Sequence, residues 1–283
     1  MLTLTNPKWI NSFYYPYQSF EEIPQSLFDA INRDLDQRTS AEPLVSIIIS
    51  AWNEEINILR SVASLSKLDT QIPFEIIVVN NNSSDNTQLT VDKLHVRSLF
   101  EQQQGCGPAR QKGQEHARGK YVLLADADSF YPPKWLDEMI TILSQPGVVV
   151  VYGRYAFISE PGYPRWQLAI LETLKNWIAA IRHYKRPYLN TYGLSMGYIK
   201  ELGLRVGFIK SRFWGDDGAL TYDLMKYGTV KQVKSSRAVI WTYPRTLQRD
   251  GTLFQAFKKR ILRDLGRFGE FFSTKMKSHA PRE

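Results

Sequence analysis

Two pairs of aspartates in the sequence could do chemistry that isolated surface charges cannot. Asp126 and Asp128 stand one residue apart, directly after the apolar run YVLLA, and Asp216 and Asp217 are adjacent in WGDDGAL. Two carboxylates suit a hard divalent cation that also binds phosphate oxygens. Two adjacent carboxylates raise each other's proton affinity, which suits a general base working near neutral pH.

Each pair also fits an ordinary structural role. Taken alone, an Asp-x-Asp after a strand is more often a solvated strand end than a metal site. The adjacent pair precedes a helical pattern, so both carboxylates could cap that helix, and capping is compatible with a catalytic role. The surrounding elements therefore have to distinguish these readings.

Apolar runs of strand length alternate with helical patterns through the first half of the chain. Strands are expected at 44–50, 74–80, 95–100 and 120–125, and helices at 53–68, 108–119 and 132–145. This alternation predicts an α/β fold with a mostly parallel sheet flanked by helices. Ligands bind such sheets at the carboxyl ends of the strands, where Asp126 and Asp128 fall. A turn after Ala125 would let both carboxylates converge.

The second half of the chain is less regular. It predicts a long helix over 163–184, a helix that starts at the Asp216 pair and ends at Gly228, and two short strands within 229–243. Residues 252–272 predict an amphipathic helix, and residues 231–283 hold 13 Lys and Arg against 4 Asp and Glu. The basic character is therefore a C-terminal feature.

Composition narrows the protein class. The single cysteine, Cys106, cannot form an internal disulfide, and the N-terminal residues lack the pattern of a signal peptide. The longest apolar runs are far shorter than the ~20 residues that span a bilayer. We therefore expect a cytoplasmic protein, with peripheral contact to the inner membrane face through 252–272 as an open alternative to packing of that helix on the core.

One segment resembles a known family. It is GCGPARQKGQEHARGKYVLLADADSFYPPKWL, similar to the stretch of family 2 glycosyltransferases in which a Gly-x-Ala-Arg helix precedes a strand ending in Asp-x-Asp. Further similar stretches follow the family's order: VSIIISAWNEEINILRSVASL, FEIIVVNNNSSDNT, GLSMGYIKELG and WGDDGALTYDLMKYG. The resemblance covers roughly residues 44–245.

The resemblance implies a GT-A fold and inverting transfer from a nucleotide sugar to a saccharide or lipid-linked acceptor, in surface polysaccharide or glycolipid assembly. It implies an N-terminal extension (1–43) packed on a catalytic domain (44–250), followed by a basic helix and tail (251–283). Within the domain, residues 44–130 would bind the nucleotide and residues 131–250 the acceptor.

By position, the resemblance also assigns the site. The nucleotide-sugar contacts would be Ser50, Trp52, Glu54, Asn81, Arg110 and Asp126. Trp52 would stack on the base, and Arg110 would reach the nucleotide from its helix. Asp128, with Asp126, would hold Mn²⁺ or Mg²⁺. Asp217 would be the catalytic base, with Asp216 beside it.

The sequence departs from the family pattern in three places. Many relatives have aspartate where Asn81 stands, which leaves the nucleobase open. Asp216 replaces a more usual glutamate. IWTYPR lacks the late histidine that serves some relatives as a metal ligand, and His279 lies in the tail. His95, His116 and His183 are expected to be structural residues rather than ligands.

Two other function classes fit the sequence less well. A sugar-nucleotide nucleotidyltransferase would carry a Gly-rich, basic phosphate loop after the first strand, and SAWNEEIN has no glycine. A non-catalytic nucleotide- or sugar-binding relative would not need Asp126, Asp128 and Asp217 together. No nucleic acid partner is expected, because the basic stretch belongs to none of the nucleic-acid-binding motifs.

Overall fold

The structure is a computed structural model that describes residues 4–208 and 215–248. In these residues a seven-stranded sheet has the order β3-β2-β1-β4-β8-β6-β9, and a three-stranded sheet has the order β5-β10-β7. The strands are β1 (Val45–Ala51), β2 (Phe74–Asn80), β3 (Arg97–Phe100), β4 (Tyr121–Asp126), β5 (Ser129–Phe130), β6 (Val148–Tyr152), β7 (Tyr155–Phe157), β8 (Met196–Ile199), β9 (Thr229–Gln232) and β10 (Ile240–Thr242).

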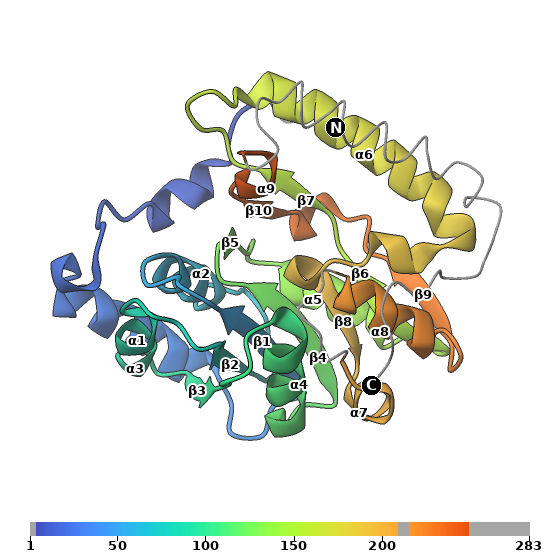
Figure 1. Ribbon diagram of the computed structural model, residues 1–283, viewed down its shortest axis with the longest axis horizontal. Helices are drawn as coiled ribbons and strands as arrows, with labels where there is room; N and C mark the ends of the chain where they lie inside the picture. The colour runs from blue at the N-terminus through green and yellow to red at the C-terminus, as the bar shows by residue number, and fades with distance from the viewer. Residues whose placement is uncertain (1–3, 209–214, 249–283) are drawn as a thin grey trace.

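Helices cover both faces of the large sheet (Figure 1). The α-helices of the described residues are α1 (Gln25–Arg38), α2 (Asn57–Leu65), α3 (Thr87–Asp92), α4 (Cys106–His116), α5 (Trp135–Leu143), α6 (Arg165–Lys185), α7 (Lys200–Val206), α8 (Asp216–Leu224) and α9 (Arg245–Gln248). The α/β fold with a mostly parallel sheet is thereby confirmed. Strand β8 is the exception, because it runs antiparallel to both of its neighbours, β4 and β6.

The central strands are buried on both faces because most of their residues are apolar and these lie on both sides of the sheet. In β1, Ile47 and Ile49 pack in one hydrophobic cluster with helices α1, α2 and α5. Ile48, between them, belongs to a second cluster with Ala109 of α4 and Leu220 of α8. Successive side chains of a strand point to opposite faces, so one apolar run builds two cores.

The segment before β1 packs against the first of these cores. Ile10 and Phe13, in a short 3-10 helix (Lys8–Phe13), are buried in the same cluster as Ile47. At the other end, the expected helix over 252–272 lies outside the described residues. Within the described part of the chain, no helix combines the length and apolar character needed to cross a membrane.

Candidate active site

The carboxyl ends of three neighbouring strands lie level with one another. Ser50 near the end of β1 pairs in register with Asp126 of β4, and Ala51 pairs with Asn80 of β2. Strand β4 continues through Asp126, so the turn follows Asp126 rather than Ala125 as the sequence suggested. The polar residues after these strands are therefore gathered at one edge of the sheet.

Arg110 is the centre of this edge. It lies on α4, is buried, and its Nη1 atom lies 2.9 Å from Oδ2 of Asp216 and donates also to Oδ1 of Asp217. Its Nη2 atom lies 3.6 Å from Oδ1 of Asp126. In the structure Arg110 joins a strand-end carboxylate to the two carboxylates of α8. Its expected contact with the nucleotide stays a prediction.

Gly193 makes this arrangement possible. Its backbone N–H donates to Oδ2 of Asp217 at 2.8 Å, so both oxygens of that carboxylate are held. A Cβ atom added at Gly193 would lie 1.8 Å from Nη2 of Arg110 and 2.4 Å from its Cζ. Only glycine therefore lets the guanidinium pass this close to the backbone.

Burial changes the acidity of two of the carboxyl groups. It raises the pKa of Asp217 to about 6, with Arg110 opposing the rise and Asp216 adding to it. It also raises the pKa of Asp126 to about 7, where Arg110 again opposes and the charge of Asp128 adds. Desolvation outweighs the arginine in both cases. Both groups can therefore exchange protons near neutral pH.

Asp216 and Asp217 are the first two residues of α8. Neither caps the helix with its side chain; the N-cap residue is Gly215, with φ at +118°. Their carboxylates accept from Arg110 instead. The helix N-terminus also favours negative charge at this position. The simple capping explanation therefore does not account for this pair.

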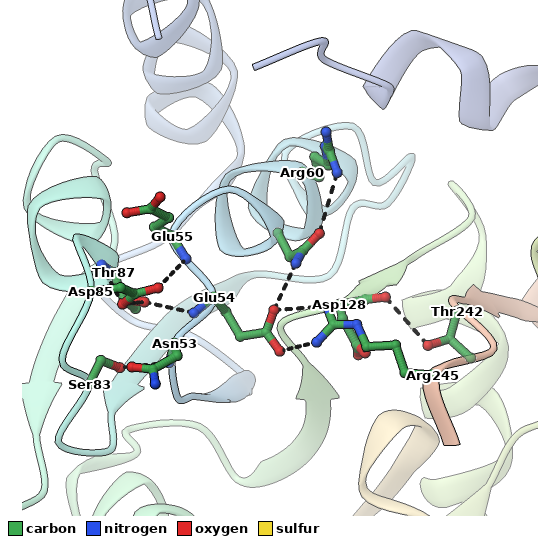
Figure 2. A network of polar contacts seen from close by, with 11 residues as sticks. Asn53, Glu54, Glu55, Arg60, Ser83, Asp85, Thr87, Asp128, Thr242 and Arg245 are labelled. Atoms are coloured by element: carbon green, nitrogen blue, oxygen red, sulfur yellow. Dashed lines mark hydrogen bonds and ion pairs between the residues drawn. The ribbon is translucent and has the colours of Figure 1, made fainter. Parts of the chain in front are cut away.

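A second arginine, Arg245, lies close to Asp128, the aspartate that follows the end of β4 (Figure 2). Arg245, at the start of α9, makes a bidentate contact with Glu54, with Nη1–Oε1 and Nη2–Oε2 distances of 2.5 and 2.9 Å. Its Nε atom lies 3.4 Å from Oδ2 of Asp128. Glu54, expected to approach the base and ribose, is thus paired with an arginine, and it also accepts from Asn57.

The side-chain amide of Asn81 forms hydrogen bonds with backbone groups. Its Nδ2 atom donates to the carbonyl oxygens of Glu101 and Gln103, at 3.3 and 2.7 Å, and its Oδ1 atom accepts from the N–H of Gly105 at 2.7 Å. The expected contact between this amide and the nucleotide stays a prediction. The hydrogen bonds of Asn81 fix the loop that leads into α4, the helix of Arg110.

Trp52 is held at the rim of the same edge, with 55% of its surface exposed. The next residue, Asn53, adopts a positive φ of 54° and accepts from the N–H of Ser84 at 2.8 Å, and its own N–H donates to Ser83. These contacts tie the loop after β1 to the loop after β2 (Figure 2). The Trp52 face remains available to stack on a planar ligand.

The donor set fits a divalent cation that also takes ligands from outside the protein. Among the described residues, no three His, Cys, Asp or Glu side chains gather closely enough to hold a metal ion. Asp126 and Asp128 supply two hard oxygen donors, and Asp128 is near enough to raise the pKa of Asp126. Mg²⁺ characteristically keeps waters and substrate phosphates beside one or two carboxylates.

The three histidines of the described residues bond to groups outside this cluster of carboxylates and arginines. His183 bonds through Nδ1 to the hydroxyl of Tyr152, and His95 lies 2.8 Å from a carboxylate oxygen of Asp36. His116, in the last turn of α4, bonds to a backbone carbonyl. Each of these three rings therefore has a protein partner.

Comparison with known families identifies the family of this chain. The sequence model of the family described as glycosyl transferase family 2 matches residues 46–211, more than half of the chain. The chain belongs to glycosyltransferase family 2. The match includes Arg110, Asp126 and Asp128 and ends before Asp216 and Asp217.

Known relatives match over part of their length. The glycosyltransferase AglE of Haloferax volcanii is 32% identical over 132 residues, which are 44% of this chain and 43% of that protein. An Escherichia coli protein, the UDP-Glc:alpha-D-GlcNAc-diphosphoundecaprenol beta-1,3-glucosyltransferase WfgD, is 29% identical over 121 residues, 41% of this chain and 47% of that one. Two Rickettsia glycosyltransferases are matched over only 21% and 19% of their length.

Solved structures show the same fold at low sequence identity. The mannosyltransferase PcManGT of Pyrobaculum calidifontis, in complex with GDP-Man and Mn²⁺, has a TM-score of 0.55 at 20% identity, covering 83% of this chain and 70% of that one. Glucosyl-3-phosphoglycerate synthase of Mycobacterium tuberculosis has a TM-score of 0.52 at 19% identity, covering 83% and 82%. These similarities establish the GT-A fold.

Two residues of the site were missed at the sequence level. Arg245 stands in the stretch IWTYPR, which the family pattern marks for a histidine rather than for an arginine. Gly193 contributes a backbone N–H, and its lack of a side chain leaves room for Arg110. The stretch GLSMG does not indicate either role. The sequence feature that could have indicated Arg245 is its place shortly after the last short strand of the domain.

Proposed function

We propose that this glycosyltransferase is a metal-dependent inverting enzyme that moves a sugar from a nucleotide sugar to a hydroxyl of a saccharide or lipid-linked acceptor. The observation that carries the proposal is the bridge made by Arg110. Through it, Asp126 at the end of β4 lies against one Nη atom of the guanidinium, and Asp217 at the start of α8 contacts the other. A donor held at Asp126 would face a base at Asp217.

Asp217 is the base in this proposal. A group with a pKa of about 6 is ionised at neutral pH yet basic enough to take a proton from an attacking hydroxyl. Its side chain keeps 15% exposure, so an acceptor can reach it. Arg110 and the N–H of Gly193 hold the carboxylate in one orientation.

The donor would lie along the carboxyl ends of β1 and β4. Trp52 would stack on the nucleobase beside Ser50, and Asp126 and Asp128 would hold the metal. A bound divalent cation would act as a Lewis acid on the diphosphate oxygens as charge develops there. Residues 44–130 thereby form the nucleotide-binding half, and residues 131–250 the acceptor half.

The names of the relatives support the donor and acceptor classes. WfgD is named as transferring glucose from UDP-Glc to a diphosphoundecaprenol-linked sugar, and PcManGT was solved with GDP-Man and Mn²⁺. We extend to this chain the classes only: a nucleotide sugar, a divalent metal, and a saccharide or lipid-linked saccharide. A cytoplasmic protein acting in surface polysaccharide or glycolipid assembly fits these classes.

The proposal is tested by a thermal-shift panel of UDP- and GDP-sugars, each with and without Mn²⁺. A donor raises the Tm by mass action, and the rise should be larger with Mn²⁺ and should shrink in Asp128→Asn. A matched control is Asp92→Asn, which removes an exposed helix carboxylate. If no nucleotide sugar shifts the Tm of the wild-type protein under any metal condition, the proposed donor class is wrong.

A further inference from the structure

Arg245 occupies an unusual position for a residue with no assigned role. Its guanidinium lies between Glu54, which follows β1, and Asp128, which follows β4 (Figure 2). It comes from α9, far along the chain, and reaches the edge of the sheet where the nucleotide halves of doubly wound folds bind phosphates. An ordinary surface ion pair joins neighbouring elements, whereas this one joins distant segments of the chain at the strand ends.

We propose that Arg245 is a further catalytic residue, whose guanidinium binds the diphosphate of the donor and stabilises it as the leaving group, with Glu54 as the residue that positions it. This inference rests on the proposed function. In the proposed function the metal stabilises the diphosphate. Here a side chain supplies part of that stabilisation, so diphosphate recognition does not depend wholly on the metal.

The geometry leaves the guanidinium able to take a ligand. Guanidinium has five N–H donors. The bidentate contact with Glu54 uses one on each Nη atom, and the Nε–H faces Asp128. Two N–H groups therefore remain beyond these contacts, one on each Nη atom. The Arg245 side chain is 34% exposed, so these donors can meet a phosphate from solvent.

Glu54 explains why the arginine stays in one orientation. Two parallel N–H···O contacts fix the plane of a guanidinium, which one contact cannot do. Glu54 is itself held, because Nδ2 of Asn57 donates to Oε2 at 2.8 Å and the N–H of Glu54 donates to the hydroxyl of Thr87 at 2.8 Å. The pair is thus fixed before any ligand arrives.

In the reaction, the bond between the anomeric carbon and the phosphate oxygen breaks, and its electron pair stays on the diphosphate. A bond forms between the acceptor oxygen and the anomeric carbon, and the acceptor proton moves to the carboxylate of Asp217. Arg245 stabilises the charge that develops on the diphosphate oxygens. An arginine that donates to phosphate in a fixed orientation does so without reorganising during the step.

The experiment compares diphosphate binding with nucleoside binding in Arg245→Gln. Affinities for UDP and GDP are measured by calorimetry with a chelator and again with Mn²⁺, and binding of uridine and guanosine is followed by ligand-observed NMR. With the chelator present, the variant should bind the preferred diphosphate about 10- to 100-fold more weakly, because it loses a charge-assisted contact. Nucleoside binding and the Tm of unfolding should stay within error of wild type.

Arg237→Gln is the matched control, because Arg237 is 70% exposed and pairs with Glu138 away from this edge. Glu54→Gln tests the positioning role through a double-mutant cycle. Alone it should weaken diphosphate binding about tenfold, and in the Arg245→Gln background it should add nothing, because its effect acts through the arginine. Additive losses would remove the positioning role.

Four results would overturn the inference. One is an Arg245→Gln protein that binds the diphosphate within twofold of wild type in the chelator. Another is a variant that also loses nucleoside binding, which indicates a collapsed pocket rather than a lost phosphate contact. If wild type transfers sugar and the variant does so at the same kcat, the proposed function stands and the role of Arg245 is wrong. If wild type binds no nucleotide, both fail.

Discussion

Replacing Asp217 by asparagine should remove transfer while making the protein more stable. The carboxylate is the proposed base, so losing it should lower kcat about 10²- to 10⁴-fold, the range for a general base. Donor binding should change little, because the asparagine amide oxygen can still accept from Gly193 and Arg110 still holds Asp216. The assay is release of nucleoside diphosphate with acceptor present, beside calorimetry of donor binding.

The stability effect follows from the pKa of the same group. A rise from 3.8 to about 6 means that the ionised form costs about 3 kcal/mol in the folded protein. Asparagine resembles the neutral form, so about 3 kcal/mol is the upper bound of the gain, roughly 5 °C in Tm for a chain of this size.

The pH dependence gives the sign of this effect. The unfolded chain ionises Asp217 near pH 3.8 and the folded protein near pH 6, so wild type loses stability between these values as the pH rises. The Tm difference between Asp217→Asn and wild type should therefore be small at pH 4 and largest above pH 6. Wild-type kcat should also rise with pH through about 6, and the variant should lack that limb.

Either of two results would refute this reasoning. Transfer by Asp217→Asn within threefold of wild type means that another group takes the proton. A variant that melts below wild type at pH 8 means that the contact with Arg110 outweighs the burial of the charge. Asp92→Asn, which alters an exposed helix carboxylate, is the control for both readouts and should change neither.

Two further variants test the supports of the site. Arg110→Met should destabilise the protein by about 3–5 kcal/mol in urea unfolding at pH 8, because it leaves buried carboxylates without their cation. The loss should shrink at pH 5, where Asp126 and Asp217 are protonated; an equal loss at both pH values would contradict the ion-pair account. Trp52→Ala should weaken nucleotide binding about 3- to 10-fold by calorimetry without lowering the Tm, since the ring is 55% exposed; unchanged affinity would show that no base stacks there.

The strands that build the site could be predicted because each is a nearly continuous apolar run. Strand β2 has the predicted bounds, and β1 and β4 differ by one residue at each end. Strands β5, β7 and β8 have two to four residues, too few for a pattern to stand out. Their pairing depends on partners far along the chain, such as Trp241 of β10 opposite Phe130 of β5, which no local pattern contains.

The roles of individual polar residues were harder to predict than their positions. Asn81 and Arg110 lie at this edge, as expected. Their side chains bond to other protein groups, which the sequence did not indicate. A motif gives the place of a side chain on its element but not what the rest of the fold brings against it. Gly193 and Arg245 come from segments more than 80 residues beyond Arg110, so their contacts follow from the tertiary structure alone.

The balance of charge at this edge explains why arginines and a metal would both be needed. Five carboxylates of the described residues contact or adjoin two guanidinium groups. The carboxylates are Glu54, Asp126, Asp128, Asp216 and Asp217, and the cations are Arg110 and Arg245. With all of them ionised, three negative charges remain in excess, and a diphosphate alone would meet repulsion. A divalent cation removes most of that excess. Arg110 balances the side that holds the base, which leaves Arg245 as the cation placed to meet the leaving group.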